Sequence, residues 1–409
     1  MVLSPRLRSH EDSMALYILA TLTPVALLAV ASVLGGAWAW AALGYIALLT
    51  AALDESLPKP HKAEGNTAGR FATNALSVVL ALAHPVLIAL GLWAIAGPSG
   101  LTPGARIALF LALGLFSGQV SNANAHELIH RKSRVLQALG RMVYTVMLFG
   151  HHASAHLLIH HRLVGTRADP NTARDGENCY QFFWRAWRGS FRKGLAEETA
   201  RRKTRARGLH PYAWYVGGAV AALGAAALIA GLPGVVVFVW LTIFSGSQLL
   251  LSDYVQHYGL RRGILADGTP ERQGPQHSWN APHVFSSALL LNAPRHSDHH
   301  LNAGRTYPEL RLDDQTMPML PHSLPVMALI ALWPPLWHRV MDPLAAAWQP
   351  AWEGRGGVPQ KTVLVPENGG LPRPALPSSD HVHTPQPDDP ARRPARAGPA
   401  ANSDERGGV

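Results

Sequence analysis

Six long apolar runs limit what this chain can fold into more than any other feature of the sequence. Each run has close to the roughly 17 to 25 residues that an α-helix needs to cross the hydrocarbon core of a bilayer. Backbone N–H and C=O groups find no water there, so a spanning segment must satisfy them internally. The sequence therefore predicts an all-α integral membrane protein. The six expected transmembrane helices cover residues 14–34, 37–53, 75–96, 107–126, 212–230 and 235–251.

The two ends of the chain differ from this apolar region. The first run is too long for the apolar core of a cleaved signal peptide, and it continues through Gly35 and Gly36 into the second run. Residues 1–13 are expected to form a polar N-terminus, and residues 14–353 one membrane unit. Residues 354–409 are rich in Pro and Gly and have little to bury, so a disordered tail is predicted there.

Basic residues predict the orientation of the chain, because cytoplasmic loops of membrane proteins retain Lys and Arg. Six spans put both termini on one side, together with the strongly basic segment 131–207. The loops on the opposite side, at 35–36, 97–104 and 231–234, carry no charge. We therefore expect a multi-pass protein of the inner membrane, with both termini in the cytoplasm.

The predicted cytoplasmic part, residues 126–211 and 252–353, is rich in basic residues. The formal net charge of the chain is +10, which in a membrane protein favours contact with anionic lipid, so nucleic acid is not an expected partner. Trp184, Trp187 and Phe191 interrupt the basic run, which predicts an amphipathic segment at the membrane surface; an acidic protein partner is the alternative. One cysteine, Cys179, excludes an internal disulfide, in agreement with a reducing compartment.

Histidines form three clusters near the predicted membrane ends. An isolated histidine is more often a packed or capping residue than a ligand, but the clustering argues against that interpretation here. Neutral imidazole is the commonest metal ligand, and residues three or four apart share one face of a helix. Nine histidines are too many for one ion and suit two ions with four or five ligands each. They are His126, His130, His156, His160, His161, His257, His296, His299 and His300.

Several chemistries could use such clusters. His126-Glu127-x-x-His130 matches the zinc-protease pattern, but that pattern accounts for only two of the histidines. A channel or transporter would place ionisable residues inside the spans, whereas here they lie outside them. Imidazole also suits iron, and an iron site with open positions can bind and reduce dioxygen. Glu127, Asp169 and Asp298 could orient ligand rings by hydrogen bonds, although capping and surface ion pairs are the simpler roles.

These motifs also carry a family resemblance. The match runs in order from residues 53–54 to residues 341–343. Single histidine boxes are shared with membrane fatty-acid desaturases and hydroxylases, whereas the His-Tyr-Gly and His-Ser-Trp-Asn elements favour the hydrocarbon branch. The chain therefore resembles the membrane alkane hydroxylases, or alkane 1-monooxygenases. The matching segments are 126–131, 150–162, 168–170, 176–177, 257–260, 277–280 and 295–300.

The resemblance implies a fold and an activity. Members have six transmembrane helices and a cytoplasmic centre of two iron ions, and they hydroxylate the terminal methyl of medium-chain alkanes with dioxygen. Electrons come from rubredoxin and an NAD(P)H-dependent rubredoxin reductase. Carried over to this sequence, the iron ligands are the nine histidines named above. An apolar channel among the helices would lead the alkane to the irons, and Trp40 or Tyr45 could limit its depth.

The sequence also departs from the usual alkane pattern. Arg131 stands where lysine is commoner, and Gln256 stands where glutamate is commoner. Both are more similar to xylene monooxygenase, which hydroxylates methyl groups on aromatic rings. An aromatic methyl monooxygenase and a fatty-acyl hydroxylase or desaturase are therefore the alternatives. The single cysteine cannot form the metal site of a rubredoxin, so we expect the electron donor to be a separate protein.

Overall fold

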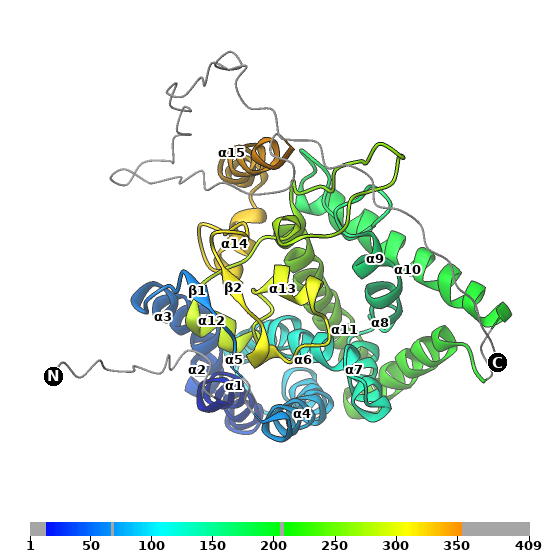
Figure 1. Ribbon diagram of the computed structural model, residues 1–409. Coiled ribbons are helices and arrows are strands. Elements are labelled where there is room, and N and C mark those ends of the chain that lie inside the picture. Colours follow the sequence, from blue (N-terminus) through cyan, green and yellow to red (C-terminus); the bar gives the residue numbers. More distant parts are fainter. Residues whose placement is uncertain (1–13, 67–68, 205–207, 354–409) are drawn as a thin grey trace, which may run out of the picture. The chain divides into compact units, whose positions relative to one another are not determined.

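The structure, a computed structural model, describes residues 14–66, 69–204 and 208–353 (Figure 1). The expected polar N-terminus and the expected disordered tail lie outside these residues. Helices dominate the described part, and two short strands, β1 and β2, pair antiparallel. The prediction of an all-α fold is confirmed.

The elements are α1 (Met14–Leu34), α2 (Ala37–Gly44), the π-helix η2 (Tyr45–Leu49), α3 (Thr50–Ser56), β1 (Lys62–Ala63), α4 (Arg70–Ala96), α5 (Pro103–Phe116), the π-helix η3 (Ser117–Ser121), α6 (Asn122–Ile129), α7 (Arg134–Val146), α8 (His152–Ala155), the π-helix η4 (His156–His160), α9 (His161–Leu163), α10 (Cys179–Thr204), α11 (Pro211–His257), the 3-10 helix η5 (Pro275–His277), α12 (Val284–Leu289), α13 (His296–Leu301), the 3-10 helix η6 (Tyr307–Glu309), β2 (Leu312–Asp313), α14 (Leu324–Ala331) and α15 (Pro334–Glu353).

Five helical stretches of the described chain are long and apolar enough to cross a membrane: Met14–Leu34, Ala37–Ser56, Arg70–Ala96, Pro103–Ile129 and Pro211–His257. The first four contain the first four predicted spans. The fourth continues without interruption through α5, η3 and α6, so the end of a membrane helix carries His126 directly. The chain is therefore a multi-pass membrane protein.

The last stretch, α11, contains both the fifth and the sixth predicted spans. Its backbone leaves helical geometry at Ala230 and at Gly231, where φ is 61°. On a straight helix, residues 215 and 246 would lie about 46 Å apart. Both residues nevertheless lie next to the adjacent residues Phe149 and Gly150. A Cβ at Gly150 would lie 2.9 Å from Tyr215, and a Cβ at Gly246 would lie 3.4 Å from the ring of Phe149. The two halves of α11 thus fold back on each other, and six crossings remain a prediction.

The helices pack around two apolar cores. One core lies among α1, α2, α4, α5 and α11, with Phe116 and Phe238 buried at its centre. The second joins α6, α7, α10, α11 and α15 and contains Tyr144, Tyr254 and Trp337. In Figure 1, α13 lies between α6, α9 and α11 in the middle of the view. The second core therefore holds together α6, α8 and the end of α11, which carry or adjoin six of the nine histidines.

Candidate metal centre

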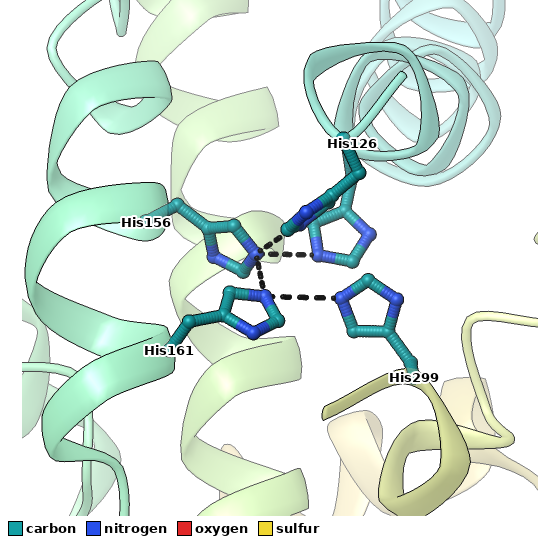
Figure 2. A group of neighbouring side chains, drawn as sticks. His126, His156, His161 and His299 are labelled. Atoms are coloured by element: carbon teal, nitrogen blue, oxygen red, sulfur yellow. Dashed lines mark hydrogen bonds between the residues drawn. The ribbon is translucent and has the colours of Figure 1, made fainter. Parts of the chain in front are cut away.

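The structure brings all nine candidate histidines into two neighbouring groups. Within each group, one ring nitrogen of every histidine lies within 4.8 Å of those of the others. Figure 2 shows four members of the first group converging from α6, from the α8–α9 segment and from α13. The first group consists of His126, His130, His156, His161 and His299, and the second of His160, His257, His296 and His300. Their role as metal ligands remains a prediction.

Helical spacing accounts for most of these positions. His126 and His130 are four residues apart at the end of α6, so their rings leave the same face. His296 and His300 share a face of α13 in the same way, and both belong to the second group. His299 lies next to them in sequence but points to the first group. One short helix therefore supplies histidines to both groups.

The π-helix η4 divides the middle cluster between the two groups. His156 and His161 are five residues apart, which on an α-helix would place them about 140° apart around the axis. A π-helix bonds residue i to residue i+5, so these two positions come onto one side. Their Nε2 atoms lie 2.9 Å apart. His160, directly before His161, faces the other way and joins the second group.

The separations between ring nitrogens test whether a metal would fit. A metal with octahedral ligands at about 2.1 Å has neighbouring ligand atoms about 3.0 Å apart. The Nε2 atom of His156 lies 2.8 Å from that of His126 and 3.1 Å from that of His130. In the second group, the Nε2 atom of His296 lies 3.0 Å from that of His257 and 3.1 Å from that of His300. These spacings match such a set of ligands.

Hydrogen bonds among the rings cannot satisfy this arrangement by themselves. Each neutral imidazole carries one N–H group, yet Nε2 of His156 faces three other Nε2 atoms at once. Nε2 of His160 is buried with no hydrogen-bond partner among the described residues. A cation in each group would satisfy these nitrogen lone pairs together. The residues present therefore fit two metal ions.

Burial keeps the rings in the form that binds metal. Desolvation, followed by the neighbouring histidines, holds the pKa values of His156, His161 and His299 well below the ordinary value. Burial is also the main reason that the pKa of His130 falls to about 3. These rings are therefore neutral at pH 7, with a nitrogen lone pair available. A neutral imidazole is the ligand form that metals require.

Asp169 contacts the ring of one candidate ligand, His160, directly. Its Oδ2 lies 2.8 Å from Nδ1 of His160 and accepts a hydrogen bond from the hydroxyl of Thr172. Burial alone would lower the pKa of His160, but the Asp169 carboxylate outweighs it and raises that pKa. The contact fixes the proton on Nδ1 and turns Nε2 towards the second group. A carboxylate behind a ligand histidine is a recurring feature of metal sites.

Glu127 and Asp298 have different partners from the expected ones. Glu127 forms an ion pair with Arg131 at 2.7 Å and accepts the backbone N–H of Tyr307 at 3.0 Å. Asp298 accepts two contacts from Arg305, at 2.6 and 2.8 Å. Neither carboxylate has a hydrogen bond to a histidine ring in the part of the chain that the structure describes. They fasten α6 and α13 to the following loops, and so position the ligands through the backbone.

An apolar cavity of about 280 Å³ leads from the histidines into the membrane helices. His126 and His296 line one end, so the cavity touches both groups, and Ile46 and Phe244 line its membrane part. The expected depth limits are not there: Trp40 is 55% exposed and faces outwards, and the Tyr45 hydroxyl donates to the backbone of α1. Neither side chain lines the cavity. The π-helix η2 contributes Ile46 instead.

Two features of the site were missed in the sequence. His152 is buried and lines the cavity, and its ring centre lies 5.1 Å from that of His156, although it belongs to neither group. Its position four residues before His156 was the available signal, because that spacing shares a helix face. The second is a contact: Asp253, which the sequence places with His257 at this end of the membrane, lines the cavity and accepts a hydrogen bond of 2.6 Å from Asn171. No local pattern indicates that pair, since 82 residues separate its members.

Comparison with known proteins places this geometry in a family. The model of the fatty acid desaturase family matches residues 101–328, which is more than half of the chain. An alkane 1-monooxygenase of Pseudomonas putida is 36% identical over 59% of this chain. Alkane 1-monooxygenase 2 of Pseudomonas aeruginosa is 30% identical over 76% of this chain and 85% of its own length. The hydroxylase component of the xylene/toluene monooxygenase of Pseudomonas putida is 28% identical over 87% of this chain and 94% of its own length.

The extent of these matches differs. The chain spans 61% of the length of the first alkane 1-monooxygenase, so the similarity to that protein covers part of it. The matched family region contains all nine histidines and most of the cavity wall. The expected resemblance to the alkane hydroxylases is confirmed.

The neutral rings make the stability of the metal-free protein depend on pH. In the unfolded chain the histidines bind protons below about pH 6.5, whereas most of the buried rings do not. Below pH 6.5 the unfolded state therefore binds more protons than the folded state. The free energy of unfolding is highest above pH 6.5 and decreases as the pH falls, by up to about 1.4 kcal/mol per pH unit for each such ring. We expect the melting temperature of chelator-treated protein in detergent to fall between pH 7 and pH 5. His130→Gln should weaken the decrease, and an unchanged melting temperature would contradict neutral burial.

Proposed function

The chain belongs to the fatty acid desaturase family and to its alkane 1-monooxygenase branch, and from this premise we propose that it is a membrane-bound non-haem di-iron monooxygenase. Its substrates would be medium-chain alkanes, hydroxylated at the terminal methyl to primary alcohols. One observation carries the proposal: two adjacent histidine groups open onto a single apolar cavity. The similarity to alkane 1-monooxygenases supports the reaction type.

The two groups would hold one iron ion each. His126, His130, His156, His161 and His299 would bind the first ion, and His160, His257, His296 and His300 the second. Bound iron would supply the redox chemistry that reduces dioxygen and oxidises an unactivated C–H bond. Asp169 would keep the His160 ring in one tautomer throughout, because it holds the Nδ1 proton.

The cavity would select and orient the hydrocarbon. An alkane has no polar group to recognise, so its binding comes from burial, at about 0.8 kcal/mol per methylene. A chain lying past Ile46 and Phe244 would reach His126 and His296 with one end. The apolar walls would also exclude water from the reacting carbon. Position in the cavity, rather than bond strength, would then determine which carbon reacts.

The reaction needs an external source of electrons. One atom of dioxygen enters the alcohol and the other leaves as water, with two electrons and two protons consumed. We propose rubredoxin and an NAD(P)H-dependent rubredoxin reductase as the donors. The basic residues near the histidine end suit a cytoplasmic site in the inner membrane. An acidic carrier protein could then approach from the cytoplasm.

A second candidate function is supported by Gln256. This residue lines the cavity and donates to the carbonyl of Ala293 at 3.0 Å, so its difference from the alkane pattern lies at the substrate. Together with the long match to the xylene/toluene hydroxylase component, this supports a monooxygenase for methyl groups on aromatic rings. The other difference, Arg131, binds Glu127 and lies outside the cavity lining.

The zinc-protease alternative has little support. His126 and His130 belong to a group of five histidines, beyond the usual ligand number of zinc. Glu127 would have to activate a water molecule at the metal. Its carboxylate instead pairs with Arg131 and with the backbone of Tyr307.

Product analysis tests the proposed reaction. We expect reconstituted membranes with rubredoxin, its reductase, NADH and dioxygen to convert octane to 1-octanol, with one oxygen atom from ¹⁸O₂ in the product. Gas chromatography with mass spectrometry would identify the alcohol. Offering xylene and an acyl substrate in parallel separates the candidates. Preferred conversion of xylene to its benzylic alcohol would replace the alkane assignment, and label from water would reject both monooxygenases.

Metal content tests the ligand assignment without an activity assay. Purified protein should contain about two iron ions per chain, because the histidines form two groups. His156→Ala should lower the iron content of the first site, and His296→Ala that of the second. Exposed His61 provides the matched control, so His61→Ala should retain full iron content. A single zinc ion that survives His296→Ala would overturn the di-iron assignment.

The cavity wall offers a test of chain-length selection. Phe244 narrows the membrane part of the cavity, so Phe244→Ala should shift the preferred alkane towards longer chains by lengthening the available space. Trp40→Ala is the matched control, because Trp40 faces outwards. Competition among alkanes of increasing length, followed by product analysis, would measure the preference. An identical shift in both variants would remove Phe244 from the substrate path.

A further inference from the structure

Helix α10 carries a stripe of exposed apolar side chains along one side. Phe182, Ala186 and Ser190 form the opposite, buried side of the helix. The exposed residues follow one another at intervals of three or four, so they lie above each other on the helix surface. We define the aromatic stripe as Tyr180, Trp184, Trp187, Phe191 and Leu195. A contiguous exposed apolar surface of this kind marks an interaction site.

Basic residues flank the aromatic stripe. Arg188 and Arg192 are exposed and lie beside it on the helix surface. The guanidinium of Arg188 stands over the ring of Trp184, at 5.2 Å from its centre. An apolar face bordered by cations is typical of helices that lie in the plane of a membrane surface. The Trp and Tyr side chains are also those that gather at the boundary between lipid and water.

The aromatic stripe meets other apolar segments of the chain at two points. At the start of α10, the hydroxyl of Tyr180 donates to the carbonyl of Leu332, next to Trp333, which is 68% exposed. Halfway along α10, the ring of Phe191 packs 5.2 Å from that of buried Tyr212, in the first turn of the membrane helix α11, where Trp214 is 67% exposed. The stripe therefore contacts an element that enters the membrane.

The direction of α10 agrees with a position at the membrane surface. In Figure 1, α1 and α4 are viewed nearly along their axes, whereas α10 runs across the view. The helix therefore lies crosswise to α1 and α4. Its inner side packs on α8 and η4, which carry His152 and His156. A surface contact along α10 would thus set the position of the histidine groups relative to the bilayer.

We propose that α10 lies in the headgroup layer of the membrane, with its aromatic stripe against acyl chains and Arg188 and Arg192 on anionic lipid phosphates. Charge complementarity and the contact with the membrane helix α11 favour lipid over an acidic protein as the partner of this face. This contact is separate from the proposed reaction, since none of these side chains lines the cavity.

Spin-label accessibility tests the proposal in reconstituted vesicles that contain phosphatidylglycerol. The only native cysteine is replaced by Cys179→Ser, and single labels are then placed at Trp184→Cys, Trp187→Cys or, as the control, exposed Ala196→Cys on the far side of the helix. We expect the two stripe labels to collide several-fold more with oxygen, relative to a water-soluble nickel complex, than the Ala196 label does. Equal nickel access at all three positions would overturn the proposal. The proposal would also be overturned if the stripe labels became shielded from nickel only after a soluble acidic protein was added.

Lipid selectivity provides a second measurement that leaves the aromatic stripe unchanged. Spin-labelled phosphatidylglycerol should be immobilised by the native protein more than spin-labelled phosphatidylcholine. The combined Arg188→Gln and Arg192→Gln variant should bring this ratio towards one. The combined Arg272→Gln and Arg311→Gln variant, in which both exposed arginines lie outside α10, should leave the ratio as it is. An unchanged ratio in the Arg188 and Arg192 variant would reject the phosphate contact.

Discussion

Nitrogen lone pairs crowded against one another are the interaction on which the rest of this structure depends. Nε2 of His156 faces three other ring nitrogens at 2.8 to 3.1 Å. Without a cation, neutral rings at this spacing cannot all donate and accept, and burial disfavours protonating them. A bound cation would stabilise this arrangement of rings. It would thereby hold together the four segments that meet here, which are α6, α8–α9, the end of α11 and α13.

The surroundings keep these rings in place when they are brought together. Asp169 fixes His160 through a contact of 2.8 Å, while Glu127 and Asp298 tie α6 and α13 to neighbouring loops. On the membrane side of the rings the cavity is lined by apolar residues, among them Leu249 and Phe244. The two histidine groups thus border an apolar cavity. That combination suits attack on a hydrocarbon, which offers nothing polar to bind.

Much of this architecture could be predicted from the sequence, because bilayer thickness and helical periodicity act locally. The apolar runs become long helices, and the nine histidines converge. The partners of Glu127 and Asp298 were missed, because they depend on how distant loops return to α6 and α13. The cavity wall was also misjudged: Trp40 has the right size, but the rotation of its helix turns it outwards. Rotation about a helix axis depends on packing against neighbours, which composition does not reveal.

The π-turn at η4 has a consequence for how two centres are encoded. If one residue between His156 and His160 were deleted, the segment would become an ordinary α-helix. The three imidazoles would then fall at positions i, i+3 and i+4, on a single face. The first centre would be overcrowded with six rings, and the second would be left with three, although no histidine had been lost. A single inserted residue in η4 therefore keeps the histidines in two separate groups, whereas the uninterrupted α-helix would gather most of them into one.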